Sequence, residues 1–334
     1  MRQVAADRLA RIIGMGSYVP ERVLSNADLE KLVDTSDEWI YTRTGIRERR
    51  IAGEEEFPST MGLEAARRAL RDSALSTDLI ELVIVATMTP DHICPSTAAL
   101  IEAELFGRRL PALDIQAACT GHLYALSMAK AYIESGMYRC VLVVSTEKMS
   151  AFVDYEDRAT CVLFGDGASA AVVAARGPGL AIDHLALGSD GSLGELICIP
   201  SGGARSPASE ETVAQKSHCI RLHGKEVFKH AVRRMAEAVE SCLEQAGAAR
   251  SEISWFVPHQ ANWRIMHALC KQLAIQEERL WKTIHKYGNT SASSVGIALD
   301  ELEKRGKLEG GSRVLLIAFG GGLTWGAALL TKTE

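Results

Sequence analysis

The chain has 334 residues, of which 47% are hydrophobic and 24% are charged, and its formal net charge is −5. This composition excludes a disordered protein and a small disulfide scaffold, and the length predicts about two domains or one large α/β unit. The negative balance argues against bulk attraction to nucleic acid, so any basic docking surface must be local.

The cysteines and the start of the chain favour a cytoplasmic protein. None of the eight cysteines lies in a C-x-x-C pair, which argues against a zinc ribbon or a thioredoxin motif. Residues 1–10 contain charged side chains and no apolar core of a secretory signal. The longest apolar runs, such as Leu82–Met88, are far shorter than the ~20 residues of a membrane span. We therefore expect reduced thiols and no membrane contact.

Short apolar runs with β-branched residues, bounded by Gly, Pro or charge, predict buried strands. In chain order they are Arg11–Gly16, Leu82–Met88, Ala112–Gln116, Cys140–Thr146, Val162–Phe164 with Ala170–Ala174, Trp255–Pro258 and Val314–Phe319. Apolar residues at near-helical spacing predict helices between them. These are Ser59–Ser73, Cys119–Ser135, Lys225–Ala246, Asn262–Leu273 and Ser291–Arg305. The alternation indicates an α/β fold with a largely parallel sheet covered by helices.

A weak internal repeat divides the chain. Phe164–Gly167 and Phe319–Gly322 share the pattern F-G-x-G, each precedes an apolar run, and they lie almost half the chain apart. The repeat predicts two similar halves, residues 1–175 and 176–334, each closed by a Gly-rich hairpin. The segment Gly188–Ser217 is rich in Gly and Ser and is interpreted as a long loop between the halves.

Cys119 is the first candidate for chemistry. It lies where a predicted strand ends and a predicted helix begins, and the partial positive charge of a helix N-terminus lowers the pKa of a cysteine there. Such a thiol is a better nucleophile. The alternative is a packing role, because cysteine is among the most buried residue types. The other seven cysteines are interpreted as packing residues.

Three further segments offer groups for the same chemistry. His259 follows a predicted central strand, at the end where α/β folds place ligands, although a lone histidine is more often a satisfied polar residue. Asn289 either caps the next helix or donates its amide into a site. The glycines of Phe319–Gly322 permit close backbone approach, so their N–H groups could point at a reacting oxygen, although such turns are more often structural.

Two motifs imitate cofactor or metal sites and are rejected. Gly165–Ala170 matches a dinucleotide fingerprint, but the apolar run after it is too short for the helix that such a fingerprint needs. His218 and His223 are five residues apart, a spacing that suits no helical pair of metal ligands. We expect neither a nicotinamide cofactor nor a metal ion.

The ordered set of motifs resembles a known family. The motifs A-A-C-x-G, V-P-H-Q-A-N, G-N-T-S-A-S-S and F-G-G-G-x-T-W-G occur in this order in the thiolase-like condensing enzymes, and among these the chain resembles the β-ketoacyl-acyl-carrier-protein synthase III family. The segments Thr35–Ile40 and Thr42–Arg49 resemble that family as well, and the resemblance extends from about Ile12 to Thr331. It implies a five-layered αβαβα fold of two similar halves and a homodimer.

The resemblance implies that Cys119, His259 and Asn289 are catalytic. Cys119 would take the acyl group of an acyl-CoA as a thioester, with the backbone N–H groups of Cys119 and Gly321 as oxyanion hole. His259 and Asn289 would stabilise the enolate that forms when malonyl-acyl-carrier protein loses CO₂. The product would be a β-ketoacyl-acyl-carrier protein, which starts type II fatty acid synthesis, and no metal, nicotinamide or flavin takes part.

The resemblance also implies binding residues. Those for CoA are Trp39 and Arg158 around the adenine, Arg43 at phosphate or adenine groups, and Asn262 on the pantetheine arm. An acidic carrier protein needs a local basic patch, and the candidates for it are Lys229, Arg264 and Lys271. Considered singly, each of these three residues is better interpreted as a solvated charge on the surface than as a docking residue.

Some positions depart from the family pattern. His122 stands where an aromatic residue is common, and it is either a packed polar residue or a group that tunes the thiolate. Ala159 follows Arg158 where glycine is usual. Cys94 stands where some members have a phenylalanine that reaches across the dimer to the acyl pocket, and Phe164 is the other residue expected in that pocket. The smaller Cys94 predicts tolerance of primers longer than acetyl.

Two alternatives stay open. One is a synthase III-like ketosynthase or acyltransferase of secondary metabolism with a different acyl acceptor. The other is a catalytically silent thiolase-fold partner subunit, which is less favoured because the chain keeps all three catalytic residue types.

Overall fold

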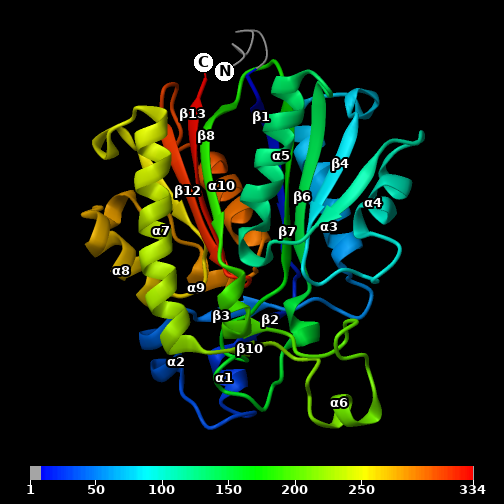
Figure 1. Ribbon diagram of the computed structural model, residues 1–334, viewed down its shortest axis with the longest axis vertical. Helices are drawn as coiled ribbons and strands as arrows, with labels where there is room; N and C mark the ends of the chain where they lie inside the picture. The colour runs from blue at the N-terminus through cyan, green and yellow to red at the C-terminus, as the bar shows by residue number, and fades with distance from the viewer. Residues whose placement is uncertain (1–8, 334) are drawn as a thin grey trace.

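The computed structural model describes residues 9–333, so most of the chain start interpreted above lies outside the described residues. The elements form five alternating layers of helices and strands (Figure 1). The strands of the central layers belong to one nine-stranded sheet with the order β11-β12-β13-β8-β1-β7-β6-β4-β5, which bends into two half-sheets around two buried helices. The expected αβαβα arrangement is thereby confirmed.

The first half-sheet has five strands. They are β1 (Arg11–Tyr18), β4 (Leu82–Ala86), β5 (Ala112–Ile115), β6 (Cys140–Glu147) and β7 (Gly167–Ala174). Helices α3 (Pro58–Ser73) and α4 (Thr97–Leu105) cover its outer face. Strand β4 is apolar throughout because both faces are buried: Val83 and Val85 join the core under α3, whereas Ile84 joins the core of the middle layer.

The second half-sheet repeats this plan. Its strands are β8 (Leu180–Ser189), β11 (Trp255–Pro258), β12 (Arg313–Gly320) and β13 (Thr324–Lys332), and α7 (Gly224–Ala246) and α8 (Trp263–Leu273) cover its outer face. The order β8-β13-β12-β11 matches β1-β7-β6-β4 in the first half. A parallel bridge between Phe256 and Leu280 stands where β4 pairs with β5. The repeated order agrees with two similar halves, and the boundary at residue 175 stays a prediction.

The middle layer consists of α5 (Gly121–Ser135) and α10 (Ser293–Lys304), which lie between the half-sheets (Figure 1). Both helices begin at the same end of the molecule, where a Cβ atom built on Gly121 would lie 3.3 Å from the Cβ atom of Ala292. The starts of these helices are therefore in direct contact. At the other end of the fold, β1 pairs with β8 through Arg11 and Ile12 and joins the half-sheets.

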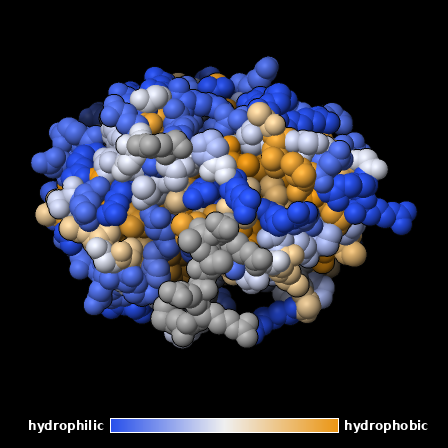
Figure 2. All heavy atoms as spheres, turned by 90° about the horizontal axis from the view of Figure 1, so that it is seen from above, coloured by the Kyte–Doolittle hydropathy of each residue, from blue (hydrophilic) through white to orange (hydrophobic). Residues whose placement is uncertain are grey.

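The remaining short elements lie mostly below the half-sheets in Figure 1. They are β2 (Val23–Ser25), α1 (Asn26–Leu29), α2 (Asp37–Thr44), β3 (Glu48–Arg50), β9 (Ile197–Cys198), α6 (Glu210–Ala214), β10 (Arg221–Leu222) and α9 (Ile284–Tyr287). Figure 2 views the opposite end and shows a mostly hydrophilic surface interrupted by hydrophobic areas. Within residues 9–333, no helix has the length and apolar character needed to cross a bilayer.

Three sequence predictions about the fold were wrong in part. The sheet is mixed rather than largely parallel, because β7 and β13 run antiparallel to both of their neighbours. Only the second half closes with a tight Gly-rich hairpin, since residues 148–166 connect β6 to β7. The predicted loop Gly188–Ser217 contains the end of β8, strand β9 and helix α6.

Candidate active site

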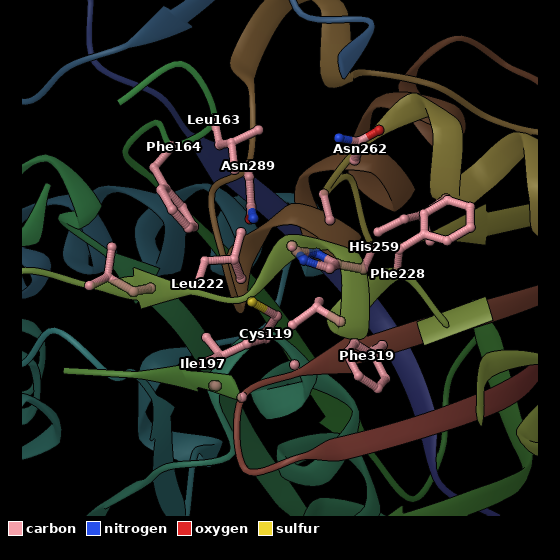
Figure 3. A pocket seen from close by; sticks show the side chains of 18 of the residues that line it. Cys119, Leu163, Phe164, Ile197, Leu222, Phe228, His259, Asn262, Asn289 and Phe319 are labelled. Atoms are coloured by element: carbon pink, nitrogen blue, oxygen red, sulfur yellow. The ribbon is translucent and has the colours of Figure 1, made fainter. Parts of the chain in front are cut away.

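One cavity of about 720 Å³ brings together residues from both halves of the chain (Figure 3). Its walls are largely apolar, with Leu163, Ile197 and Phe319 among the lining side chains. Cys119, His259 and Asn289 all line it, and Figure 3 shows them converging from different segments. The three residues predicted to be catalytic thus share one cavity.

Cys119 lies in a short 3-10 turn, Ala118–Thr120, immediately before α5. Ala118 has φ 44°, in the left-handed region that residues with a side chain rarely adopt. The turn is pressed against Gly320 at the end of β12, where an added Cβ atom would lie only 2.7 Å from the backbone nitrogen of Cys119. A glycine is therefore required at position 320 for Cys119 to take this place.

Burial raises the pKa of the Cys119 thiol to about 12. A hydrogen bond with the side chain of Ser291 acts in the opposite direction, and the negative charge of Glu147 raises the pKa further. The expectation of a lowered thiol pKa was wrong, because removal of the thiolate from water outweighs the favourable field at the start of α5. The thiol needs a proton acceptor before it can attack.

His259 follows β11 and is held from behind by Ser294 of α10. The Nδ1 atom of His259 lies 2.6 Å from the Oγ atom of Ser294, and that oxygen also accepts a hydrogen bond from the backbone N–H of Gln260 at 3.4 Å. If the Ser294 hydroxyl donates its hydrogen to Nδ1, the ring proton of the neutral imidazole lies on Nε2, which is the tautomer that the proposed reaction below requires. Burial lowers the pKa of His259 to about 3, so the imidazole is neutral near pH 7.

Asn289 is fixed through its side-chain oxygen. Oδ1 accepts a hydrogen bond from the backbone N–H of Ser291 at 2.8 Å, which leaves the amide nitrogen free to face the cavity. The backbone of Asn289 is bound to the first half of the chain, because its N–H donates to Leu163 and its carbonyl accepts from Gly165. The F-G-x-G motif at Phe164 thus positions Asn289.

The cavity includes some of the other predicted residues. Gly321, Phe164, Asn262, Lys229 and Arg264 line it. Lys271 and Cys94 do not, and both are exposed.

The residues predicted to bind CoA adenine lie outside the cavity but cluster with one another. The guanidinium carbons of Arg43 and Arg158 lie 4.6 and 4.8 Å from the ring centre of Trp39. A base stacked between Trp39 and Arg158 needs a separation of about 7 Å, which is twice a van der Waals contact. Arg158 would have to move away from Trp39 to admit it.

His122 is buried on α5 and is absent from the cavity wall. Its Nδ1 atom lies 2.9 Å from the Oγ atom of Ser145 on β6, and burial lowers its pKa to about 4. The ring is therefore uncharged near pH 7. These contacts fit the interpretation of His122 as a packed polar residue.

The sequence reasoning missed three residues that organise the site, Glu147, Ser291 and Ser294, and it gave Gly320 only as part of the Gly-rich turn Phe319–Gly322. The sequence does contain a signal for Glu147 and for the two serines. Glu147 ends a strand that begins with five apolar residues and is buried throughout, and the serines belong to the largely polar run Thr290–Ser294, which is also buried throughout. A polar run placed in the core marks a segment whose hydroxyl groups have specific partners. Within residues 9–333, no group of three or more His, Cys, Asp or Glu side chains is placed to hold a metal ion.

Comparisons with known proteins agree with this geometry. Residues 113–191 match the family described as 3-oxoacyl-[acyl-carrier-protein] synthase III, and residues 243–332 match its C-terminal part. A β-ketoacyl-[acyl-carrier-protein] synthase III of Chlamydia muridarum is 56% identical over 97% of this chain and 99% of its own length. The crystal structure of 3-oxoacyl-[acyl-carrier-protein] synthase III from Aquifex aeolicus is 48% identical and superposes with a TM-score of 0.89, covering 96% of this chain and 99% of that one.

A polyketide enzyme is also similar to the chain. The priming β-ketosynthase of the R1128 polyketide pathway is 38% identical, with a TM-score of 0.89 over 98% of this chain and 97% of that one. Sequence identity and coverage at the levels found for Chlamydia muridarum and Aquifex aeolicus show common membership. This chain belongs to the 3-oxoacyl-[acyl-carrier-protein] synthase III family.

Proposed function

We propose that this protein condenses an acyl-CoA primer with malonyl-acyl-carrier protein, giving a β-ketoacyl-acyl-carrier protein, CoA and CO₂, and so starts type II fatty acid synthesis. The observation that carries the proposal is the shared cavity of Cys119, His259 and Asn289. A nucleophile and two neutral hydrogen-bond donors at one apolar cavity are what acyl transfer followed by decarboxylation requires. Membership of the family supports the same reaction.

The first half-reaction is acyl transfer to Cys119. The sulfur attacks the thioester carbonyl carbon of acyl-CoA, and CoA leaves as the acyl-Cys119 thioester forms. The oxyanion of the tetrahedral intermediate needs two donors, for which we propose the backbone N–H groups of Cys119 and Gly321. Their placement is supported by the contact of the 320–321 segment with the nucleophile turn and with the cavity.

The second half-reaction is decarboxylation and condensation. When malonyl-acyl-carrier protein loses CO₂, negative charge develops on its thioester oxygen, and the Nε2–H group of His259 and the amide of Asn289 donate to that oxygen. Each such donor typically lowers a barrier by about 3–4 kcal/mol. A neutral His259 can fill this role because an uncharged imidazole still has one N–H group that donates a hydrogen bond. The carbanion then attacks the acyl carbonyl carbon, and Cys119 leaves.

We propose that CoA and the carrier protein approach the mouth of this cavity. Lys229 and Arg264 are exposed and line it, so they offer positive charge to an acidic partner where the phosphopantetheine arm enters. Lys271 lies two turns after Arg264 on α8 and extends the basic surface. We propose that Asn262, which lines the cavity at the start of α8, bonds the pantetheine arm, and that the group formed by Trp39, Arg43 and Arg158 binds the adenine once Arg158 has moved.

We infer a homodimer and a cytoplasmic location. Strand β5 is at the edge of the sheet and offers unpaired backbone groups to a second copy. The adjoining segment exposes Ile93 to 90% and Cys94, so Cys94 can reach an acyl pocket only across such an interface. Its small side chain would leave room in the partner's pocket for primers longer than acetyl. Eight unpaired thiols fit a reducing compartment.

A role in secondary metabolism is the second candidate, favoured by the similarity to the R1128 priming ketosynthase. The two functions differ in their acceptor. A fatty acid enzyme requires malonyl on the housekeeping carrier protein, whereas the alternative would prefer another carrier, CoA or a small nucleophile. A panel of acyl-CoAs assayed with each malonyl acceptor separates the two functions. In the same panel, at least one C6–C10 acyl-CoA should be turned over faster than acetyl-CoA.

The direct test is covalent labelling. Radiolabelled acyl-CoA should leave one equivalent of acid-stable label on the wild-type protein and none on Cys119→Ala. His259→Ala and Asn289→Ala should still accept the label but lose malonyl decarboxylation by about 10²–10³-fold each. Label on Cys119→Ala would end the proposal, as would full condensation by either of the other variants.

A further inference from the structure

The carboxyl group of Glu147 is buried behind the nucleophile and held by hydroxyl and backbone N–H donors. Glu147 is the last residue of β6 and is 0% exposed. The donors are the hydroxyl groups of Thr87 (3.3 Å), Thr89 (2.6 Å) and Ser291 (3.1 Å) and the backbone N–H groups of Met88 (3.1 Å) and Ala292. All of them are uncharged. No step of the reaction proposed above involves this carboxyl group.

Ser291 connects this carboxyl group to the Cys119 thiol. The Ser291 hydroxyl donates to Oε1 of Glu147 at 3.1 Å, and the same side chain is close enough to the Cys119 thiol to lower its pKa. Ser291 has φ 50°, again in the left-handed region, and strained backbone of this kind is kept where the surrounding structure enforces a particular placement. One hydroxyl group therefore lies between the nucleophile and a buried carboxylate.

The charges around Glu147 are few. The charge of Glu147 acts on Cys119, whose pKa it raises. The two buried histidines of this region, His122 and His259, bring no charge near pH 7, because burial lowers their pKa values to about 4 and about 3. Lys148, the next residue in the chain, turns its amine to backbone carbonyl groups elsewhere. Cys119 and Glu147 can therefore exchange a proton with little interference from other charges.

We propose that Glu147, acting through the Ser291 hydroxyl, receives the Cys119 proton when the thiol attacks acyl-CoA. The thiol proton passes to Ser291 Oγ while the Ser291 proton passes to Glu147 Oε1. The bond between Cys119 sulfur and the acyl carbon forms, the bond between that carbon and the CoA sulfur breaks, and the CoA thiolate takes a proton from solvent. In the condensation, Cys119 leaves as a thiolate and recovers its proton from Glu147 by the same route. This inference rests on the proposed function.

The electrostatics favour such an exchange. Burial raises the pKa of Glu147 to about 7, close to the pH at which the protein works, and a proton acceptor is most effective there. The negative charge of Glu147 is one cause of the raised pKa of Cys119. Once Glu147 is protonated, this cause is removed and the pKa of the thiol falls. The exchange moves one negative charge within the site instead of creating a second. Glu147 and Ser291 are thus positioning residues that act on the nucleophile.

The first test is the pH profile of Cys119 alkylation by iodoacetamide, followed at this residue by peptide mass spectrometry. In a coupled pair, the logarithm of the wild-type rate should rise with pH up to about 7 and then flatten, because above that pH the proton is only redistributed within the pair. Glu147→Gln should rise through pH 9 with no break near 7. Identical profiles for the two proteins would overturn the proposal.

The second test separates the half-reactions in Glu147→Gln and Ser291→Ala. Acyl transfer, measured as label bound to Cys119, should fall about tenfold or more in each variant. Decarboxylation, measured as CO₂ released from malonyl-acyl-carrier protein without acyl-CoA, should be retained, because Asn289 is held by the backbone of Ser291 rather than by its hydroxyl. Ser294→Ala is the matched control from the same buried segment and should show the opposite pattern, since it contacts His259.

Each outcome has a distinct meaning. If both half-reactions fall together in Glu147→Gln and Ser291→Ala, the network only holds the fold and the proposal fails. If Glu147→Gln does not fold, Ser291→Ala decides alone, because it removes one hydroxyl group and no charge. If Cys119→Ala accepts label, the proposed function itself fails. If Cys119 is required but Glu147→Gln transfers acyl groups normally, only the present inference fails.

Discussion

The Oγ atom of Ser294 lies 2.6 Å from Nδ1 of His259, so a residue in the first turn of α10 holds the imidazole ring in its orientation. The backbone N–H of Gln260 occupies an acceptor position of the same hydroxyl and fixes its direction. Ser294 and His259 are 35 residues apart, and the contact joins the end of β11 to the middle layer.

This relationship predicts the effect of Ser294→Ala. Without the hydroxyl, the imidazole can place its proton on either nitrogen, and the ring loses its fixed orientation. Malonyl decarboxylation should fall about 10-fold to 100-fold, less than in His259→Ala, while acyl transfer to Cys119 stays near the wild-type rate. Release of CO₂ and binding of radiolabelled acyl groups measure the two steps. Equal loss of both steps would contradict the assignment.

Gly320→Ala should disturb the nucleophile. The new Cβ atom would lie 2.7 Å from the backbone nitrogen of Cys119, so the turn that carries the thiol has to shift. We expect a loss of about 1–3 kcal/mol in the free energy of unfolding and a strong reduction of acyl labelling. Gly107→Ala, at a glycine with open space around it, is the control and should change neither property. Urea unfolding and labelling with acyl-CoA provide the measurements.

Trp39→Ala should raise KM for acyl-CoA while leaving kcat nearly unchanged. Loss of one aromatic stacking partner of a base typically costs about 1–3 kcal/mol, which corresponds to a KM increase of about 5-fold to 150-fold. An acyl-pantetheine substrate has no adenine, so wild type and Trp39→Ala should use it equally well. A matching defect with acyl-pantetheine would show that Trp39 does not act on the adenine.

His122 should make the protein sensitive to acid. Its pKa is about 4 in the folded chain and 6.5 as the ordinary value, so between these pH values the unfolded chain binds more protons. His122 therefore does not reduce the free energy of unfolding above pH 6.5, where it is neutral in both states. The free energy of unfolding falls as the pH decreases from 6.5 towards 4, because the unfolded chain is protonated first. Between pH 7 and pH 5 the loss should be about 2 kcal/mol.

His122→Phe should remove this part of the pH dependence. The comparison is between free energies of unfolding in urea at pH 7 and pH 5, so the constant cost of losing the Ser145 contact cancels. Replacement of the exposed His92 by asparagine is the control and should leave the difference as in wild type. A variant His122→Phe with the full wild-type difference would show that the imidazole is not the cause.

The sequence was most informative where burial is continuous along the chain. Strand β11 (Trp255–Pro258) and helix α7 were predicted almost to the residue, because apolar runs and helical spacing are local patterns. Strand β8 was missed as a strand, since Asp183 and His184 interrupt its apolar run and its second half is only partly buried. The direction of β7 depends on pairing with two distant strands, which no local pattern encodes.

The candidate site was likewise predictable from the sequence only in part. Cys119, His259 and Asn289 stand at recognisable junctions, and the resemblance to a family named them. Their supporting contacts join segments that are far apart, such as Glu147 and Ser291, which are separated by 144 residues. The thiol pKa could not be predicted either. The position before a helix suggested a lowered value, whereas the depth of the cavity, known only from the fold, raises it.

The contact between the starts of α5 and α10 has a consequence for how such a centre can diversify. Two topologically equivalent corners of a duplicated scaffold face each other, one presenting a sulfur nucleophile and the other an amide. Each corner is braced by the other half of the chain, since Leu163 and Gly165 bind the backbone of Asn289 and Gly320 packs against the turn of Cys119. A substitution at one corner is therefore felt at the other, and the two are expected to change together.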